Sequence, residues 1–160
     1  MNDFRILGLA GSLRRASLHR DLVRAARELA LEGVAIEPYE KLGDLPFFNQ
    51  DVDDEGDPAP VRELKEKVRE ADAVLIATPE YENVIPGVLT TALDWWALRS
   101  PSPLRHKPVG IVGASPGGAG TARGQMVLRQ IVLHAPHTSC PNPRCSSPTL
   151  ARSSTWRQAT

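Results

Sequence analysis

The chain has 160 residues, of which 41% are apolar, and its 19 basic side chains are balanced by 19 acidic ones. This length suffices for one domain with a hydrophobic core. Zero net charge argues against a nucleic-acid or membrane-surface protein, which normally carries a basic surplus. No apolar run approaches the ~20 residues of a membrane span. Because the first residues also lack the pattern of a signal peptide, we expect a cytoplasmic protein.

The charge is spread unevenly along the chain. Residues 134–160 hold three arginines, both cysteines and no acidic side chain. This segment is rich in Pro, Ser and Thr and has few large apolar residues, so it is predicted to be a disordered tail. We expect residues 1–133 to form the folded domain. Neither the spacing of the cysteines nor that of the four histidines is typical of a metal site.

Short apolar segments alternate with amphipathic ones in the first half of the domain. Residues 4–10 are apolar and precede Gly11, which is typical of a buried parallel strand. Apolar residues then recur at helical spacing over residues 18–32. Residues 34–39 form a second predicted strand, which Pro38 places at a sheet edge. The acidic, Pro- and Gly-rich segment 43–60 is predicted to be a long loop.

The same alternation continues to the end of the domain. The pattern predicts a short helix over residues 61–68, the strongest strand over 71–78, a helix from Pro86 to Trp96, a fourth strand over 109–114, and a helix over 125–133. Four successive βα units require a parallel sheet with helices on both faces, so the fold class is α/β. Ligands of such sheets bind at the carboxyl ends of the strands.

Three loops follow predicted strands at that edge. The first, residues 11–17, precedes a helix whose N-terminus favours an anion, and its serines and arginines would add donors to a phosphate. It matches neither the dinucleotide nor the nucleotide-hydrolysing glycine motif. Alternatively, Ser17 only caps the helix and the arginines are solvated.

The second and third loops are suited to a flat ligand. The second loop, residues 78–87, holds prolines on both sides of Tyr81, and these residues would suit stacking and hydrogen bonding of a heteroaromatic ring. Alternatively, Tyr81 packs on Trp95 or Trp96. In the third loop, residues 114–121, glycines allow close approach of a ligand to the backbone. The alternative is a mobile turn.

The segments GSLRRASLH, ADAVLIATPEY followed by PGVLTTALDW, and KPVGIVGASPGGAGTARGQMVLRQ occur in this order between residues 4 and 133. Together they resemble the NADPH-dependent FMN reductase family of flavodoxin-like enzymes, which includes quinone and chromate reductases. The resemblance implies a doubly wound parallel sheet, FMN as cofactor and NADPH or NADH as reductant. It also implies a homodimer or homotetramer.

The resemblance assigns cofactor-binding residues in all three loops. FMN phosphate would bind at Ser12, Arg14, Ser17 and His19, and the isoalloxazine at Pro79, Glu80, Tyr81, Glu82, Ser115, Gly117 and Gly118. Two positions depart from the family, which usually has Asn where this chain has His19 and Glu82. An inward-pointing Glu82 carboxylate would weaken the binding of reduced flavin. A general base at His19 or an acid at Asp94 is a weaker interpretation, because hydride transfer to flavin needs neither.

The implied activity is NAD(P)H-dependent reduction of a small-molecule acceptor such as a quinone, a flavin or a metal oxyanion, by a ping-pong mechanism. The alternatives are a non-catalytic flavin-binding or redox-sensing module and a truncated inactive product. The family continues past residue 133 with a fifth strand and a terminal helix, which the tail does not resemble. Codons for a family-like Pro-Glu-Val-Leu-Val strand, read one base late, give the sequence of residues 143–147. We therefore hypothesise a frameshift near His134, which resequencing tests.

Overall fold

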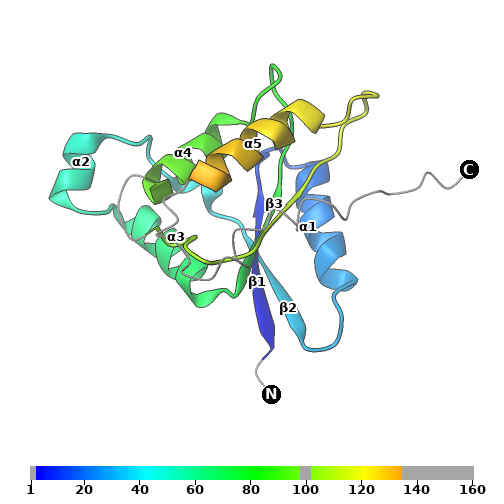
Figure 1. The fold of residues 1–160 in the computed structure, drawn as a ribbon, viewed down its shortest axis with the longest axis horizontal. Coiled ribbons are helices and arrows are strands. Elements are labelled where there is room, and N and C mark those ends of the chain that lie inside the picture. Colours follow the sequence, from blue (N-terminus) through cyan, green and yellow to red (C-terminus); the bar gives the residue numbers. More distant parts are fainter. Residues whose placement is uncertain (1–2, 98–101, 135–160) are drawn as a thin grey trace, which may run out of the picture.

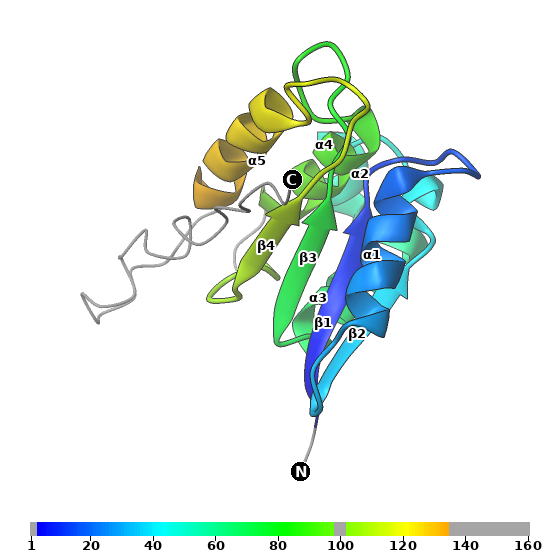
Figure 2. The same cartoon turned by 90° about the vertical axis from the view of Figure 1, so that its right-hand side faces the viewer.

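The computed structural model describes residues 3–97 and 102–134. These residues form a four-stranded sheet in the order β2-β1-β3-β4, and all of its strand pairs are parallel (Figure 2). The elements are β1 (Phe4–Ala10), α1 (Leu18–Glu28), β2 (Val34–Tyr39), the 3-10 helix η1 (Leu42–Asp44), α2 (Gln50–Glu55), α3 (Ala59–Glu70), β3 (Ala73–Ala77), α4 (Gly87–Ala97), β4 (Val109–Val112) and α5 (Ala122–His134). The predicted α/β fold with a parallel sheet is confirmed. The expected loss of a fifth strand and terminal helix, and the predicted tail, concern residues outside the described ranges.

Helices cover both faces of the sheet. Helix α1 lies on one face, and α3 and α4 lie on the other (Figure 1). The central strands β1 and β3 are therefore buried from both sides, and the side chains of Leu9 and Ile76 are completely inaccessible. Strand β2 pairs only with β1 among the described strands, so Pro38 stands at an edge as the sequence predicted.

The predicted loop over residues 43–60 is wrong in part, because this segment holds most of η1 and all of α2. The side chain of Asn49 caps α2 by accepting a hydrogen bond from the amide of Asp51 at 2.9 Å. Acidic side chains in the first turn of α2 stabilise the helix, because they lie at the positive end of its dipole. The sequence pattern missed this helix because Val52 is its single apolar residue, which leaves no periodicity to detect.

Helix α4 holds two neighbouring buried tryptophans, and one of them, Trp95, contacts this segment. Trp95 and Trp96 are 2% and 1% exposed. The indole nitrogen of Trp95 donates to the carbonyl of Pro46 at 2.9 Å, and its ring lies edge-on to Phe48 at 5.0 Å between centroids. The ordered path of residues 42–55 thus depends on tertiary contacts with α4.

Helix α1 packs very closely on β1 at Gly8. A Cβ atom built on Gly8 would lie 2.5 Å from Cγ1 of Val23, the buried valine of α1. This close approach aligns α1 against the sheet, and the N-terminus of α1 lies just beyond the carboxyl end of β1.

We expect Gly8→Ala to lower the free energy of unfolding by about 1–3 kcal/mol, since a β-branched valine cannot easily move aside. The matched control is Gly87→Ala, where an added Cβ meets no atom within 4 Å; it should change stability by less than about 0.5 kcal/mol. Urea unfolding curves of both variants measure the difference. Equal stability of the two variants would contradict the packing described here.

Candidate functional site

The three loops gather at the carboxyl edge of the sheet (Figure 2). The first and second loops follow β1 and β3, which are neighbours, and the amide of Gly11 donates to the carbonyl of Ala77 at 2.8 Å. The hydroxyl of Tyr81 lies 3.5 Å from that of Ser12. The amide of Thr78 donates to Val112 at 2.9 Å, which brings the third loop alongside. The chain turns to opposite sides after β1 and β3, so this edge is the switch point where parallel sheets bind ligands.

The first loop presents a row of unpaired donors. The backbone amides of residues 12–16 donate no hydrogen bond to any residue in the described ranges. Ser17 does cap α1, because its hydroxyl accepts from the amide of Arg20 at 3.3 Å. Ser12 and Ser17 are both only 3% exposed. Capping therefore accounts for Ser17 but not for the buried Ser12 or the open amides, and open amides at a helix N-terminus favour an anion.

Two arginines flank these amides. Arg14 and Arg15 are exposed, and neither makes an ion pair within residues 3–97 and 102–134. Their guanidinium groups are thus available to an anionic ligand at the N-terminus of α1.

His19 is a buried histidine of α1 close to the starts of the second and third loops. It is the second residue of α1, is 6% exposed, and its Nε2 has no hydrogen-bond partner. Burial lowers its pKa below the usual 6.5, while the carbonyls of Ala114 and Thr78 partly oppose that shift. The imidazole is therefore neutral at pH 7 and connects the first turn of α1 to the starts of the other two loops.

The second loop ends in a tight hairpin. The backbone N–H and C=O groups of Tyr81 and Val84 pair in both directions at 3.0 Å. Glu82 and Asn83, between them, have φ of 48° and 67°, as a type I′ turn requires. Glu82 is exposed at this turn, so the condition under which its carboxylate would weaken the binding of reduced flavin, an inward orientation, is not met. Tyr81 is 48% exposed and stands outside the core cluster that holds Trp96.

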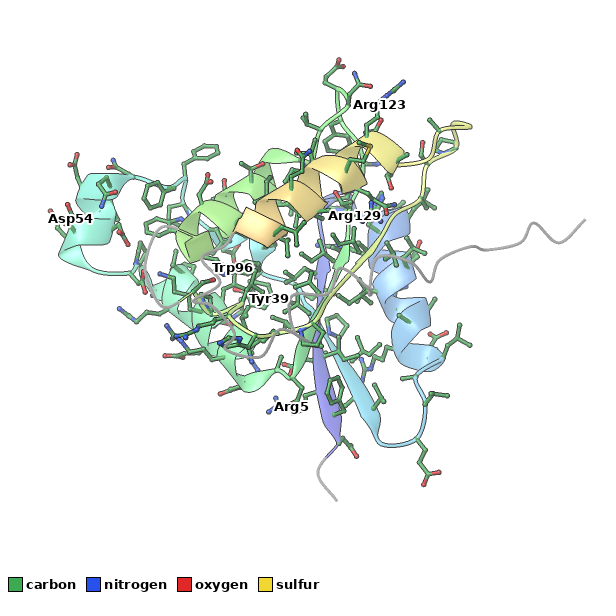
Figure 3. The ribbon with its side chains drawn as sticks, in the orientation of Figure 1. Arg5, Tyr39, Asp54, Trp96, Arg123 and Arg129 are labelled. Atoms are coloured by element: carbon green, nitrogen blue, oxygen red, sulfur yellow. The ribbon has the colours of Figure 1, made fainter. Side chains whose placement is uncertain are left out.

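Glu80 ties the second loop to α5. Its carboxylate accepts from the amide of Gly124 at 2.9 Å, one of the free donors in the first turn of α5. Arg123, which is labelled in Figure 3, lies in the first turn of α5. Its guanidinium donates to the side chain of Asn83 at 2.8 Å and lies 3.9 Å from the Glu80 carboxylate. The Glu80 carboxylate thus orients the second loop. If Glu80 also bound a ligand, it would do so while paired with the Gly124 amide and the Arg123 guanidinium.

The third loop leaves open space above its glycines. Ser115 accepts from the amide of Gly117 at 3.1 Å, and a Cβ atom on Gly118 would meet nothing within 4 Å. Its C-terminal end is fixed, because Thr121 is 2% exposed and its side chain would collide with any Cβ on Gly113.

Sequence reasoning missed several residues that hold the site together. It did not assign Thr78 or Thr121, which are the buried hydroxyls beneath the loops, nor the partners of Glu80 on α5. The available signal was a threonine at the start of the second loop and another at the end of the glycine-rich third loop. Periodicity alone gives it no weight, since threonine is common in strands and turns.

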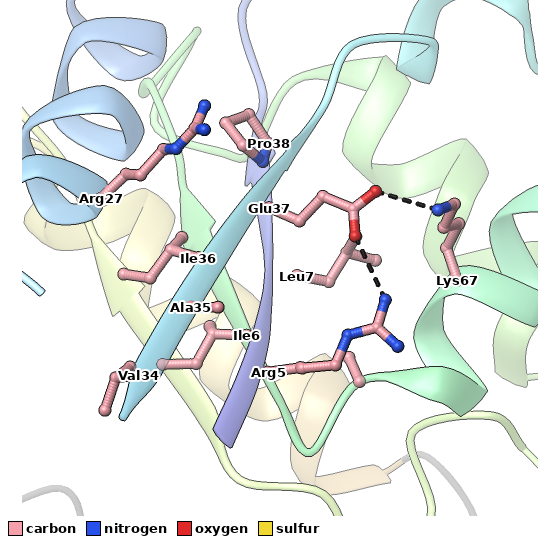
Figure 4. A pocket seen from close by; sticks show the side chains of 11 residues that line it. Arg5, Ile6, Leu7, Arg27, Val34, Ala35, Ile36, Glu37, Pro38 and Lys67 are labelled. Atoms are coloured by element: carbon pink, nitrogen blue, oxygen red, sulfur yellow. Dashed lines mark hydrogen bonds and ion pairs between the residues drawn. The ribbon is translucent and has the colours of Figure 1, made fainter. Parts of the chain in front are cut away.

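A groove of about 400 Å³ lies elsewhere, along β1 and β2 (Figure 4). Glu37 accepts hydrogen bonds there from Lys67 at 2.9 Å and from Arg5 at 3.4 Å. These two cations hold the pKa of Glu37 below its usual value. No residue of the three loops lines this groove, so the groove is separate from the candidate site that the loops form.

The described ranges hold neither a metal-binding cluster nor a helix that could span a membrane. No three His, Cys, Asp or Glu side chains there come together as a metal site would need. None of the helices in those ranges has the length and apolar character that a bilayer span requires.

Glu82→Asn should raise the free energy of unfolding by up to about 1 kcal/mol, because asparagine tolerates positive φ better than glutamate does. Glu82→Ala is the control, since it removes the carboxylate but keeps the unfavourable backbone angle. Thermal unfolding compares the two. A gain in the alanine variant as large as in the asparagine variant would point to charge rather than to backbone strain.

Comparison with known proteins agrees with this geometry. The model of the NADPH-dependent FMN reductase family matches residues 4–147. This match extends past the domain boundary expected at residue 133, into residues that the structure does not describe. An NAD(P)H-dependent FMN reductase of Pseudomonas aeruginosa is 41% identical over 132 residues, which are 82% of this chain and 71% of that protein.

Two further relatives have related descriptions. A quinone reductase of Escherichia coli K12 is 39% identical over 129 residues, covering 80% of this chain and 69% of that protein. The solved structure of FerB, a flavoenzyme NAD(P)H:(acceptor) oxidoreductase of Paracoccus denitrificans, superposes with a TM-score of 0.76 at 33% identity, over 86% of this chain and 76% of that one. The parallel sheet, the three loops at its carboxyl edge and these similarities show that the chain belongs to the NADPH-dependent FMN reductase family of oxidoreductases.

Proposed function

We propose that the three loops bind FMN and that this chain reduces a small-molecule acceptor at the expense of NADPH or NADH. The observation that carries the proposal is the row of open amides over residues 12–16 at the N-terminus of α1. A phosphate there would receive several N–H donors and the positive end of the helix dipole. The relatives described as FMN and quinone reductases support the same assignment.

The residues present fit the phosphate end of FMN. Ser12 and Ser17 are buried hydroxyls beside the open amides, and Nε2 of His19 is a buried polar atom without a partner. Such atoms are costly in a protein interior and are typical of binding sites. Arg14 would add a charge-assisted hydrogen bond to a phosphate oxygen. We assign these four residues to the phosphate.

The isoalloxazine would lie against the second and third loops. We assign to it seven residues from both loops: Pro79, Glu80, Tyr81, Glu82, Ser115, Gly117 and Gly118. Support is strongest for Tyr81, which is half exposed beside Ser12, and for Gly118, which has open space above it. Support is weakest for Glu82, which is exposed at the turn. When bound, FMN supplies hydride acceptance from NAD(P)H and hydride donation to a quinone, flavin or metal-oxyanion acceptor, in the manner of a ping-pong reaction.

The protein positions the reactants without any acid or base of its own in this scheme. Asp94 is half-buried on α4, and burial raises its pKa, but it belongs to none of the three loops. The folded unit that carries the activity is proposed to be residues 1–133. We also propose a homodimer or homotetramer, for which exposed apolar side chains on α5 and the second loop, Met126 and Val84 among them, provide suitable surface.

The purified chain, reconstituted with FMN, should show a flavin absorption band that bleaches when NADPH is added without oxygen and returns when a quinone is added. A band that does not bleach would indicate a flavin-binding module without reductase activity. A chain that retains no flavin band after reconstitution would contradict the proposal.

Arg14→Ala should weaken FMN binding by about tenfold to a hundredfold, as expected for a lost charge-assisted hydrogen bond. Binding of riboflavin, which lacks the phosphate, should not change. Arg15→Ala is the matched control and should change FMN affinity by less than about threefold, a surface-charge effect alone. Quenching of flavin fluorescence gives all of these dissociation constants. If Arg14→Ala weakened FMN and riboflavin binding equally, the arginine would not be a phosphate ligand.

A further inference from the structure

The imidazole of His19 is poorly explained by packing alone. It is 94% buried in the first turn of α1, and its Nε2 is inaccessible to solvent and lacks a hydrogen-bond partner. A buried polar atom left unpaired costs free energy, so an unpaired one at a binding site calls for a functional reason. An amide at this position, as in the family pattern noted above, could not gain a charge. An imidazole can.

Its surroundings are polar but hold no paired charge. The carbonyls of Thr78 and Ala114 both favour the protonated ring, whereas burial disfavours it more strongly. No carboxylate or cation contributes to the lowered pKa. Burial therefore keeps the ring neutral, and the two backbone carbonyls oppose this effect only in part.

The charged groups of the neighbouring elements are either paired with other residues or exposed at the surface. On α1, the guanidinium of Arg20 pairs with Glu40 at 3.5 Å, and Asp21 pairs with Arg24 at 3.4 Å. The Glu80 carboxylate is held by the amide of Gly124. The remaining charged groups on these elements are Arg14 and Arg15 in the first loop, Arg27 and Glu28 on α1, Glu82 in the second loop and Arg123 on α5, which are all exposed, and Arg129 on α5, which donates to the side chain of Gln125 at 3.1 Å. The third loop has no ionisable side chain.

We propose that His19 takes up a proton when the phosphate of the flavin binds at the N-terminus of α1, so that this chain binds FMN more tightly as the pH falls, whereas its affinity for riboflavin does not change. This inference rests on the proposed FMN site. It concerns a residue in which this chain departs from the family pattern noted above.

The physical reason is the charge that the ligand brings. A phosphate monoester carries nearly two negative charges at pH 7. His19 is the second residue of the helix whose N-terminal amides would hold that phosphate. In this water-poor setting, a nearby anion favours the imidazolium strongly. Nε2–H then becomes a donor, and the carbonyls of Thr78 and Ala114 stabilise the charged ring.

The sign of the pH effect follows from linkage. In the free protein the pKa of His19 is below 6.5, and in the complex it is raised. Well above the raised pKa the ring is neutral in both states, and the affinity does not depend on it. As the pH falls through the raised pKa, only the complex gains a proton, and FMN binds more tightly. The effect levels off below the pKa of the free protein.

The test measures FMN and riboflavin affinity of the full chain from pH 5.5 to 8.5 in phosphate-free buffers. Calorimetry in buffers of different ionisation enthalpy counts the protons taken up. We compare the wild type with His19→Asn, which restores the family residue, and with His106→Asn. His106 is an exposed histidine outside the site, so its variant is the matched control. The second ionisation of the FMN phosphate affects all three proteins alike.

Between pH 8 and pH 6, FMN affinity of the wild type should rise about threefold to tenfold relative to His19→Asn, which corresponds to a modest rise in one pKa. Proton uptake should be absent with riboflavin and unchanged in His106→Asn. Parallel pH profiles of the wild type and His19→Asn, with FMN bound by both, would overturn the inference and leave the FMN site intact. A wild type that binds no FMN at any pH would overturn both proposals.

A second measurement needs no variant of His19. Histidine Cε1 proton resonances of the wild type, titrated with and without saturating FMN, report each imidazole pKa directly. One resonance, retained in His106→Asn, should titrate at a higher pH when FMN is bound. If no histidine pKa moves on FMN binding, the inference is wrong even where His19→Asn fails to fold.

Discussion

The site depends on the parallel pairing of β1 with β2 on one side and with β3 on the other. Because these strands run in the same direction, the segments that follow β1 and β3 leave the sheet at one edge and meet there. The close contact between Gly8 and Val23 aligns α1 against the sheet, with its free amides at that edge. Loss of this alignment would separate the open amides of the first loop from the second loop.

Buried hydroxyl and imidazole groups lie beneath the three loops. Ser12, Ser17, Thr78 and Thr121 are each 3% exposed or less, and His19 is close to that. Some of these groups are satisfied locally, as Thr78 is by its bond to the Pro79 carbonyl at 2.8 Å. The amides of residues 12–16 are not satisfied within the described ranges. Hydrogen-bonded polar groups beneath the loops, together with unpaired amides on the loop surface, are typical of a site that a ligand completes.

Hydrophobic patterning was sufficient to predict the four strands, their parallel arrangement and the three loops. It failed at α2, where a single apolar residue leaves no period and formation depends on the Asn49 cap and on Trp95 of α4. Helix ends were also displaced, since α1 ends at Glu28 and α5 already begins at Ala122. Capping and packing determine these ends, and neither changes the average hydrophobicity of a segment.

The sequence by itself determined the fold class and which loops meet at the carboxyl edge of the sheet, because strand direction and loop order follow from the alternation of βα units. Only the tertiary structure decided what each loop residue does. It paired the Glu80 carboxylate with an amide in the first turn of α5, left Glu82 exposed at a turn with positive φ, and buried His19. Those roles arise from contacts between residues far apart in the chain, which no local pattern of residue types can specify.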